Sequence, residues 1–140
     1  MGNILETDSF YMSLVNLVAQ RSHATRKKVG AVIVKDKNII SFGWNGTPTG
    51  YPNQCEDSSG KTLSIVIHAE ANAICKAAKS GGNLEGATLY VSLSPCIECS
   101  KLIIQSGIKR VVFSEIYRDI SPLKLLKKSR IKVNKLIYKE

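Results

Sequence analysis

The spacing of apolar residues along the chain changes between the helical period and the strand period. Near the start, residues 8–22 carry apolar side chains three or four positions apart, which is typical of an amphipathic helix. Thr7 or Asp8 suits the capping position before its first turn. We expect this helix to bury one apolar face, formed by Phe10, Leu14, Leu17 and Val18.

Two β-rich runs follow, and together they predict a hairpin. Residues 29–35 and 39–45 are rich in Val and Ile, and they flank the turn-forming residues 36–38. The next segment, 46–62, contains three Gly and two Pro. We therefore expect a long loop there, of the kind that is functional or mobile in compact domains.

From residue 68 onward, helices and strands alternate. Ser94 and Pro95 suit the cap and first position of a helix, and Gly107 suits the residue that ends it. The order αββαβαβαβ predicts one five-stranded sheet with helices on its faces, whose helix-joined strands are parallel where they are neighbours. The predicted elements are a helix at 68–80, a strand at 87–93, a helix opened by Ser94, a strand at 110–114, a helix at 122–129 and a strand at 131–137.

Length and composition favour one soluble globular domain. The chain has 140 residues, 44% hydrophobic and 22% charged, which suits a single domain over 1–140. No apolar run approaches the ~18 residues of a membrane span, and the first residues do not resemble a secretion signal. We therefore expect a cytoplasmic protein, in the host cytoplasm if it is viral, with no membrane partner. Its four cysteines should be reduced there.

The charge is strongly positive, at +9. Such a charge makes polyanions the first candidate partners. Residues 121–140 hold seven basic side chains against Glu140 alone, and we interpret this group as a solvated face. A smaller cluster, Arg26, Lys27 and Lys28, suits a ligand that carries a phosphate.

Two short motifs carry the chemistry. His68 and Glu70 lie at the predicted start of one helix, and Cys96 and Cys99 lie three residues apart in the first turn of another. The positive end of a helix dipole favours thiolates at that position. A Cys₂His set leaves the fourth position of zinc open to water, whose pKa the metal lowers toward ~7. Glu70 is then the expected proton shuttle.

Other interpretations of the cysteines remain open. A structural zinc site could be closed by a fourth ligand, for which Cys55, Cys75 and His23 are the candidates. Cys96 and Cys99 could also form a redox pair, although that leaves His68 and Glu70 without a role. Otherwise we expect Cys55 and Cys75 to be small buried hydrophobes.

The two motifs together resemble a known signature. H-x-E followed by P-C-x-x-C is typical of zinc-dependent nucleobase deaminases. The stretches "KVGAVIV", "GWNGTPTG", "LYVSLSPC" and "SGIKRVVFSEIY" are similar to the deoxycytidylate (dCMP) deaminase family, including its short viral members. The resemblance implies a three-layer α-β-α cytidine deaminase-like fold with a mixed sheet. It also implies hydrolysis of dCMP to dUMP and ammonia, which feeds dTMP synthesis, and a homo-hexamer activated by dCTP with Mg²⁺ and inhibited by dTTP.

The resemblance also assigns roles to individual residues. It implies zinc bound by His68, Cys96 and Cys99, and a proton shuttle at Glu70. Arg26 and Tyr117 match positions that hold the 5′-phosphate. The full set of implied substrate contacts is Arg26, Asn45, Ala69, Ser94 and Tyr117. The implied effector residues are Gly43, Trp44, Gly46, Lys76 and Lys79.

The sequence departs from the family pattern in two places. Trp44 stands where tyrosine is usual in the effector loop, and the segment between Cys55 and His68 is too short for the second zinc site of some viral relatives. Two alternative functions stay open. One is a polynucleotide deaminase, acting on adenosine or cytosine in tRNA, although nucleic acid is not the expected partner. The other is a zinc-binding module without catalysis, in which Glu70 would have no purpose.

Overall fold

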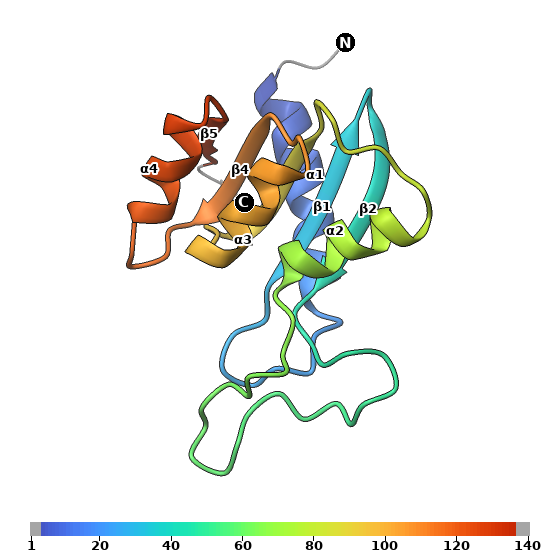
Figure 1. Cartoon of the computed structure of the whole chain (residues 1–140), viewed down its shortest axis with the longest axis vertical. Helices are drawn as coiled ribbons and strands as arrows, with labels where there is room; N and C mark the ends of the chain where they lie inside the picture. Colours follow the sequence, from blue (N-terminus) through green and yellow to red (C-terminus); the bar gives the residue numbers. More distant parts are fainter. Residues whose placement is uncertain (1–3, 137–140) are drawn as a thin grey trace.

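Helices and strands follow one another in the predicted order in a computed structural model of the chain, which describes residues 4–136 (Figure 1). Lys139 and Glu140, and the end of the strand predicted at 131–137, lie outside the described residues. The elements are α1 (Ile4–Ala19), β1 (Gly30–Lys35), β2 (Asn38–Trp44), α2 (Ala69–Lys79), β3 (Thr88–Leu93), α3 (Ile97–Gln105), β4 (Arg110–Glu115), α4 (Ser121–Lys128) and β5 (Lys132–Lys135).

The five strands form one mixed sheet in the order β2-β1-β3-β4-β5. β1 pairs antiparallel with both β2 and β3, and the pairs β3–β4 and β4–β5 are parallel. Asp36 and Lys37 make the tight turn of the hairpin at positive φ, 50° and 65°, as a type I′ turn requires. The predicted hairpin and the parallel pairing of helix-joined strands are both confirmed.

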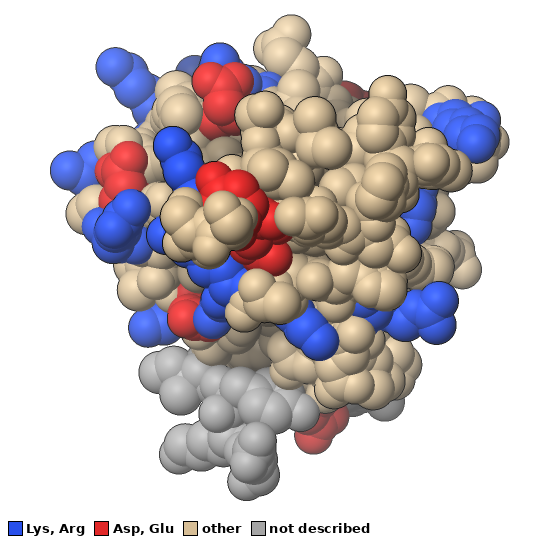
Figure 2. Space-filling model, turned by 90° about the horizontal axis from the view of Figure 1, so that it is seen from below, with Lys and Arg blue, Asp and Glu red and all other residues tan. Residues whose placement is uncertain are grey.

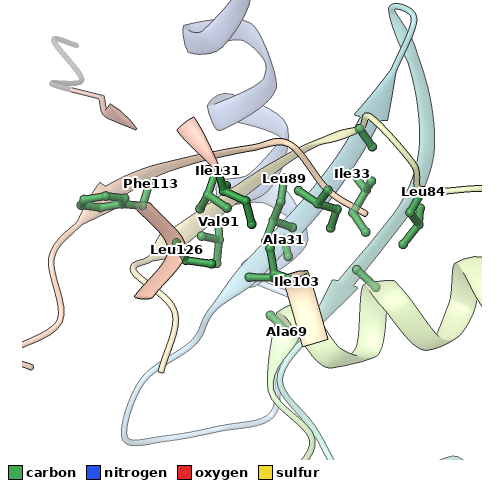
Figure 3. Close-up of a cluster of buried hydrophobic side chains, with 14 of the residues drawn as sticks. Ala31, Ile33, Ala69, Leu84, Leu89, Val91, Ile103, Phe113, Leu126 and Ile131 are labelled. Carbon is green, nitrogen blue, oxygen red and sulfur yellow. The ribbon is translucent and has the colours of Figure 1, made fainter. Parts of the chain in front are cut away.

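Helices cover both faces of the sheet and complete three layers. α1 packs on one face, where Met12 and Val15 contact a cluster that includes Val32, Tyr90 and Val112. The other three helices lie on the opposite face, toward the viewer in Figure 1. Successive side chains of a strand point to opposite faces of the sheet. Since helices cover both faces, β1 and β3 carry apolar side chains on both. Figure 3 shows the larger core, whose members include Ala31, Ile33, Ala69, Leu89, Val91, Ile103, Phe113 and Leu126.

Helix α2 lies very close to β2 because small residues meet at the contact. Ala69, Ala73 and Ala77, four positions apart, are fully buried against the sheet. A Cβ on Gly43 would lie 2.7 Å from the backbone nitrogen of Ala73, so only glycine fits there. Ser41 donates a hydrogen bond to the carbonyl of Ala73 at 2.7 Å. These contacts fix the position of α2 along β2.

The predicted buried face of the first helix is wrong for two of its four residues. Leu14 and Val18 are partly buried and pack against the cluster on the face of the sheet that α1 covers. Phe10 and Leu17 are 59% and 61% exposed, and the core side of α1 instead contains Tyr11, Met12 and Val15. The helix begins at Ile4, so Asp8 does not cap it but lies buried in its second turn. The buried face includes the carboxylate of Asp8, so its residues are not all apolar. The spacing of apolar residues therefore selected the neighbouring face of the helix.

Asp8 is buried because the sheet supplies a partner for its charge. Arg110 at the start of β4 makes two hydrogen bonds to the carboxylate, at 2.9 and 2.7 Å. Tyr90 donates a third, at 2.7 Å. Burial raises the pKa of Tyr90, so its hydroxyl stays protonated and remains a donor. Asn134 on β5 accepts a bond from Arg110 at 2.9 Å, which extends the network across the sheet.

We predict that Asp8→Ala lowers the free energy of unfolding by about 3 to 5 kcal/mol, since it leaves the largely buried charge of Arg110 without an opposite charge. Urea denaturation at fixed zinc concentration measures this. Lys101→Ala is the matched control, because it breaks the exposed Lys101–Glu98 pair (2.8 Å), and it should cost less than ~0.5 kcal/mol. Equal effects of the two variants would contradict the structural role of Asp8.

Candidate active site

The cysteines and the histidine of the two motifs lie together at one end of the sheet. His68 immediately precedes α2, Cys96 immediately precedes α3, and Cys99 lies in the first turn of α3. The Nδ1 atom of His68 is 3.4 Å from Sγ of Cys96 and 3.5 Å from Sγ of Cys99. The N-termini of the two helices therefore converge on one point.

The predicted start of the second of these helices is wrong by two residues. α3 begins at Ile97, and Cys96 is its cap, with its sulfur accepting the N–H of Cys99 at 3.5 Å. Ser94 instead accepts the N–H of Tyr117 at 2.6 Å. The sulfur of Cys96 thus takes the capping role that a serine hydroxyl usually has. It lies near the thiol of Cys99 because both residues belong to the first turn of α3.

The electrostatics of the cluster favour a thiolate at Cys96. A hydrogen bond from the Cys99 thiol, and a further one with His68, lower the pKa of Cys96 to about 3, although burial opposes this. The same contact and burial raise the pKa of the Cys99 thiol. The hydrogen bond to Cys96 raises the pKa of His68. Cys96 and Cys99 therefore share one thiol proton, and a bound metal cation would take the place of that proton.

The geometry of the three side chains fits zinc. Their ligand atoms all lie within 4.8 Å of one another. Tetrahedral zinc, with bonds of about 2.0 to 2.1 Å to nitrogen and about 2.3 Å to sulfur, separates these atoms by ~3.6 Å. The observed N···S distances of 3.4 and 3.5 Å agree with this separation. Among the described residues no fourth His, Cys, Asp or Glu joins the group, so Cys55, Cys75 and His23 do not close the site.

Glu70 lies in the first turn of α2, two residues from His68. It is 4% exposed, and burial raises its pKa to about 7, while the positive charge of His68 opposes the shift. A carboxyl group with this pKa can both hold and release a proton near neutral pH, as a general acid–base catalyst must.

A cleft of about 580 Å³ opens in front of the cluster. His68, Glu70 and Cys96 line the cleft, whereas Cys99 is buried and does not line it. The five substrate contacts implied by the resemblance, which come from five separate segments, all line the cleft. They are Arg26, Asn45, Ala69, Ser94 and Tyr117.

Some of these five residues already hold the walls of the cleft. The Asn45 side chain accepts the N–H of Val29 at 2.9 Å and donates to the carbonyl of Lys27 at 2.8 Å. Ser94 holds Tyr117 through the bond described above. An amide carries two donor hydrogens and two lone pairs, so Asn45 retains capacity for a ligand.

Charged residues outside the set of implied substrate contacts also line the cleft. Lys27 forms an ion pair with Glu115 at 2.6 Å, and Glu56 lies on the loop that precedes α2. The Arg118 guanidinium lies 5.9 Å from the centre of the Tyr117 ring. Figure 2 views this end of the molecule and shows basic and acidic side chains side by side. The sequence signalled Lys27 through the basic cluster 26–28 and Arg118 through its adjacency to Tyr117, whereas nothing in it signalled Glu56.

The implied effector residues do not share one environment. Trp44 and Gly46 line a second cavity of about 370 Å³ together with Arg21. The Lys76 ammonium lies 4.5 Å from the centre of the Trp44 ring, whereas Lys79 is exposed near the end of α2. Gly43 is buried at the contact between β2 and α2, so its lack of a side chain already has a packing reason.

Of the two remaining cysteines, Cys55 is 2% exposed, as predicted, but Cys75 is exposed, which contradicts the prediction. Cys75 lies on α2 two positions from both Ala73 and Ala77, on the side away from the sheet. No helix within residues 4–136 combines the length and the apolar character needed to cross a membrane.

The arrangement agrees with comparisons to known proteins. The sequence model for the "Cytidine and deoxycytidylate deaminase zinc-binding region" matches residues 5–115. The chain is 41% identical over 120 residues to the deoxycytidylate deaminase of Mycobacterium phage D29, covering 76% of this chain and 92% of that protein. It is 37% identical to the Saccharomyces cerevisiae enzyme of the same name over 143 residues, 95% of this chain, and spans only 46% of that protein's length.

A solved structure is similar along almost the whole chain. The dCMP deaminase of cyanophage S-TIM5, crystallised in complex with dCMP and dUMP, matches with a TM-score of 0.91 and 40% identity, covering 96% of this chain and 99% of that one. The fold is therefore the cytidine deaminase-like three-layer arrangement that the sequence indicated. By its sequence match and its fold, this chain belongs to the cytidine and deoxycytidylate deaminase family.

Proposed function

We propose that this chain hydrolyses dCMP to dUMP and ammonia. The observation that carries the proposal is the convergence of a Cys₂His group and the buried Glu70 on one cleft that is also lined by cationic side chains. The similar proteins of phage D29 and yeast are named deoxycytidylate deaminases. The cyanophage protein was crystallised with dCMP and dUMP, which are the substrate and the product of this reaction.

His68, Cys96 and Cys99 would hold zinc, with the two sulfurs as thiolates. When bound, zinc acts as a Lewis acid that makes water a nucleophile near neutral pH. Glu70 would accept a proton at its carboxylate and deliver it to the departing amino group, so that water and dCMP give dUMP and ammonia. Its burial keeps this proton away from bulk water.

The 5′-phosphate would bind at the opposite side of the cleft, near Arg26 and Tyr117. A phosphate monoester is dianionic near neutral pH, and the planar guanidinium group binds it through two parallel donors. Lys27 is a weaker candidate because Glu115 already neutralises its charge. Asn45, Ala69 and Ser94 would enclose the nucleoside between this end and Glu70.

The finer features implied by the family belong to the same proposal. They are a homo-hexameric assembly, activation by dCTP with Mg²⁺, inhibition by dTTP, and a cytoplasmic role in supplying dTMP synthesis. The second cavity, with Trp44, Gly46 and the neighbouring Lys76, supports a nucleotide effector, because aromatic and cationic groups lie together there. Rates measured with and without each effector test this part.

We predict that the purified protein with zinc releases ammonia from dCMP faster than from deoxycytidine, CMP, dCTP or a tRNA substrate. The reason is that Arg26, Lys27 and Arg118 line the cleft and would attract a phosphate monoester, which deoxycytidine lacks. Ammonia release from these substrates, measured side by side, gives the order. Preference for the tRNA would replace the dCMP assignment by the polynucleotide alternative.

We predict that Glu70→Gln keeps bound zinc but loses turnover by more than the ~10²- to 10⁴-fold typical of acid–base assistance. The ligands are untouched, whereas the same carboxylate serves both the water and the leaving amine. Zinc content by atomic absorption and kcat for dCMP separate these effects. Wild-type turnover in a zinc-loaded variant would show that Glu70 is not the proton shuttle.

We predict that Arg26→Ala costs about 2 to 4 kcal/mol of transition-state stabilisation for dCMP, much of it in KM, and almost nothing for deoxycytidine. Only dCMP carries the phosphate that Arg26 would bind. The measurement is kcat/KM for both substrates. Lys28→Ala, at an exposed cation two positions along, which does not line the cleft, is the matched control. An equal loss for both substrates would make Arg26 a structural residue.

A further inference from the structure

The segment that carries Arg26 forms neither helix nor strand, so side chains from elsewhere must hold it. Residues 22–29 connect α1 to β1. At one end, Ser22 donates to the carbonyl of Asn45 at 2.7 Å and accepts the N–H of Ala24 at 3.1 Å. At the other end, Asn45 bonds to Lys27 and Val29. The middle of the segment has a different partner.

That partner is Glu56. One oxygen of its carboxylate, Oε2, accepts the N–H of Thr25 at 3.0 Å and that of Arg26 at 3.1 Å. Two consecutive backbone N–H groups that converge on one anion form a nest, a strong arrangement for fixing a backbone. These bonds, the one from Arg26 first, hold the pKa of Glu56 below its usual value, so the carboxylate stays ionised.

Glu56 is itself held in place by a small structure of its own. Its neighbour Cys55 is 2% exposed, and the Cys55 carbonyl accepts the N–H of Leu63 at 2.8 Å. Glu56 forms an isolated antiparallel bridge with Thr62, and its carbonyl accepts a bond from Gln54 at 3.0 Å. The segment 55–63 is therefore a short anchored hairpin within the long loop, which lies beside the 22–29 segment at the lower end of Figure 1.

We infer that Glu56 is a positioning residue for recognition of the substrate phosphate: it fixes the backbone at Thr25 and Arg26 so that the Arg26 side chain lines the cleft. This inference rests on the proposed function, because it assigns to Arg26 the 5′-phosphate. It assigns no contact with substrate to Glu56. The consequence is that a carboxylate, a group that repels phosphate in direct contact, increases the affinity for a nucleotide by acting through the backbone.

The test compares two variants of Glu56 on dCMP and on deoxycytidine. Glu56→Ala removes the acceptor and should lower kcat/KM for dCMP about tenfold, mainly through KM, with less than about a twofold change for deoxycytidine. Glu56→Gln keeps a carbonyl oxygen that can accept both N–H bonds, and it should recover to within about threefold of wild type. Zinc content and melting temperature establish that each variant is folded.

A double-mutant cycle shows whether Glu56 acts through Arg26. In the Arg26→Ala background, Glu56→Ala should change dCMP kinetics less than about twofold, since the group that it positions is absent. If Glu56→Ala does not fold, Glu56→Asp replaces it, because the carboxylate is then one methylene too short to reach both N–H groups.

Four outcomes would overturn the inference. They are equal losses for both substrates, no loss for dCMP, a Gln variant as weak as the Ala variant, and tighter dCMP binding in both variants, which would show that Glu56 repels the phosphate. A wild type that does not prefer dCMP, with a silent Arg26→Ala, would refute the proposed function and this inference with it. A normal dCMP preference with a silent Glu56→Ala would refute the inference alone.

Discussion

The close contact between helix α2 and strand β2 determines where the metal ligands lie. Gly43 and the buried alanines of α2 let the two backbones approach until no Cβ would fit at Gly43. The first turn of the helix, with His68 and Glu70, is thereby placed beside the start of α3. The N···S distances of about 3.5 Å that suit zinc depend on this packing. A site made from two helix N-termini is only as well defined as the contacts that hold each helix on the sheet.

The parts of this site that carry local chemistry were predictable from the sequence, because their spacing is itself the signal. His68 and Glu70 lie two residues apart, and Cys96 and Cys99 lie three apart, within single turns of helix. Element order and strand pairing followed in the same way from hydrophobic period and turn residues. The structure agrees with these expectations except at helix boundaries, where capping by the sulfur of Cys96 replaced the expected hydroxyl.

Long-range polar pairs could not be predicted, since nothing in a single sequence marks them. Asp8 and Arg110 are 102 residues apart, and their ion pair lies on the buried side of α1, next to the face that the apolar period selected. Glu56 and Arg26 are 30 residues apart and meet through a backbone N–H, a group that every residue type except proline possesses. The spacing of hydrophobic residues assigns every carboxylate to the surface. Asp8 is buried, and for this reason the prediction that Phe10 and Leu17 lie on the buried face of α1 is wrong.

The two halves of the cleft are built on different principles, and the chemistry of their ligands explains why. A metal tolerates little displacement of its ligands, so His68, Cys96 and Cys99 lie at the ends of helices that are packed on the sheet. A phosphate is recognised over a longer range by charge, and its candidate residues lie on irregular segments that side chains such as Asn45 and Glu56 hold. If the proposed function holds, substitutions in those segments should change which nucleotide binds while the Cys₂His group and Glu70 keep their positions.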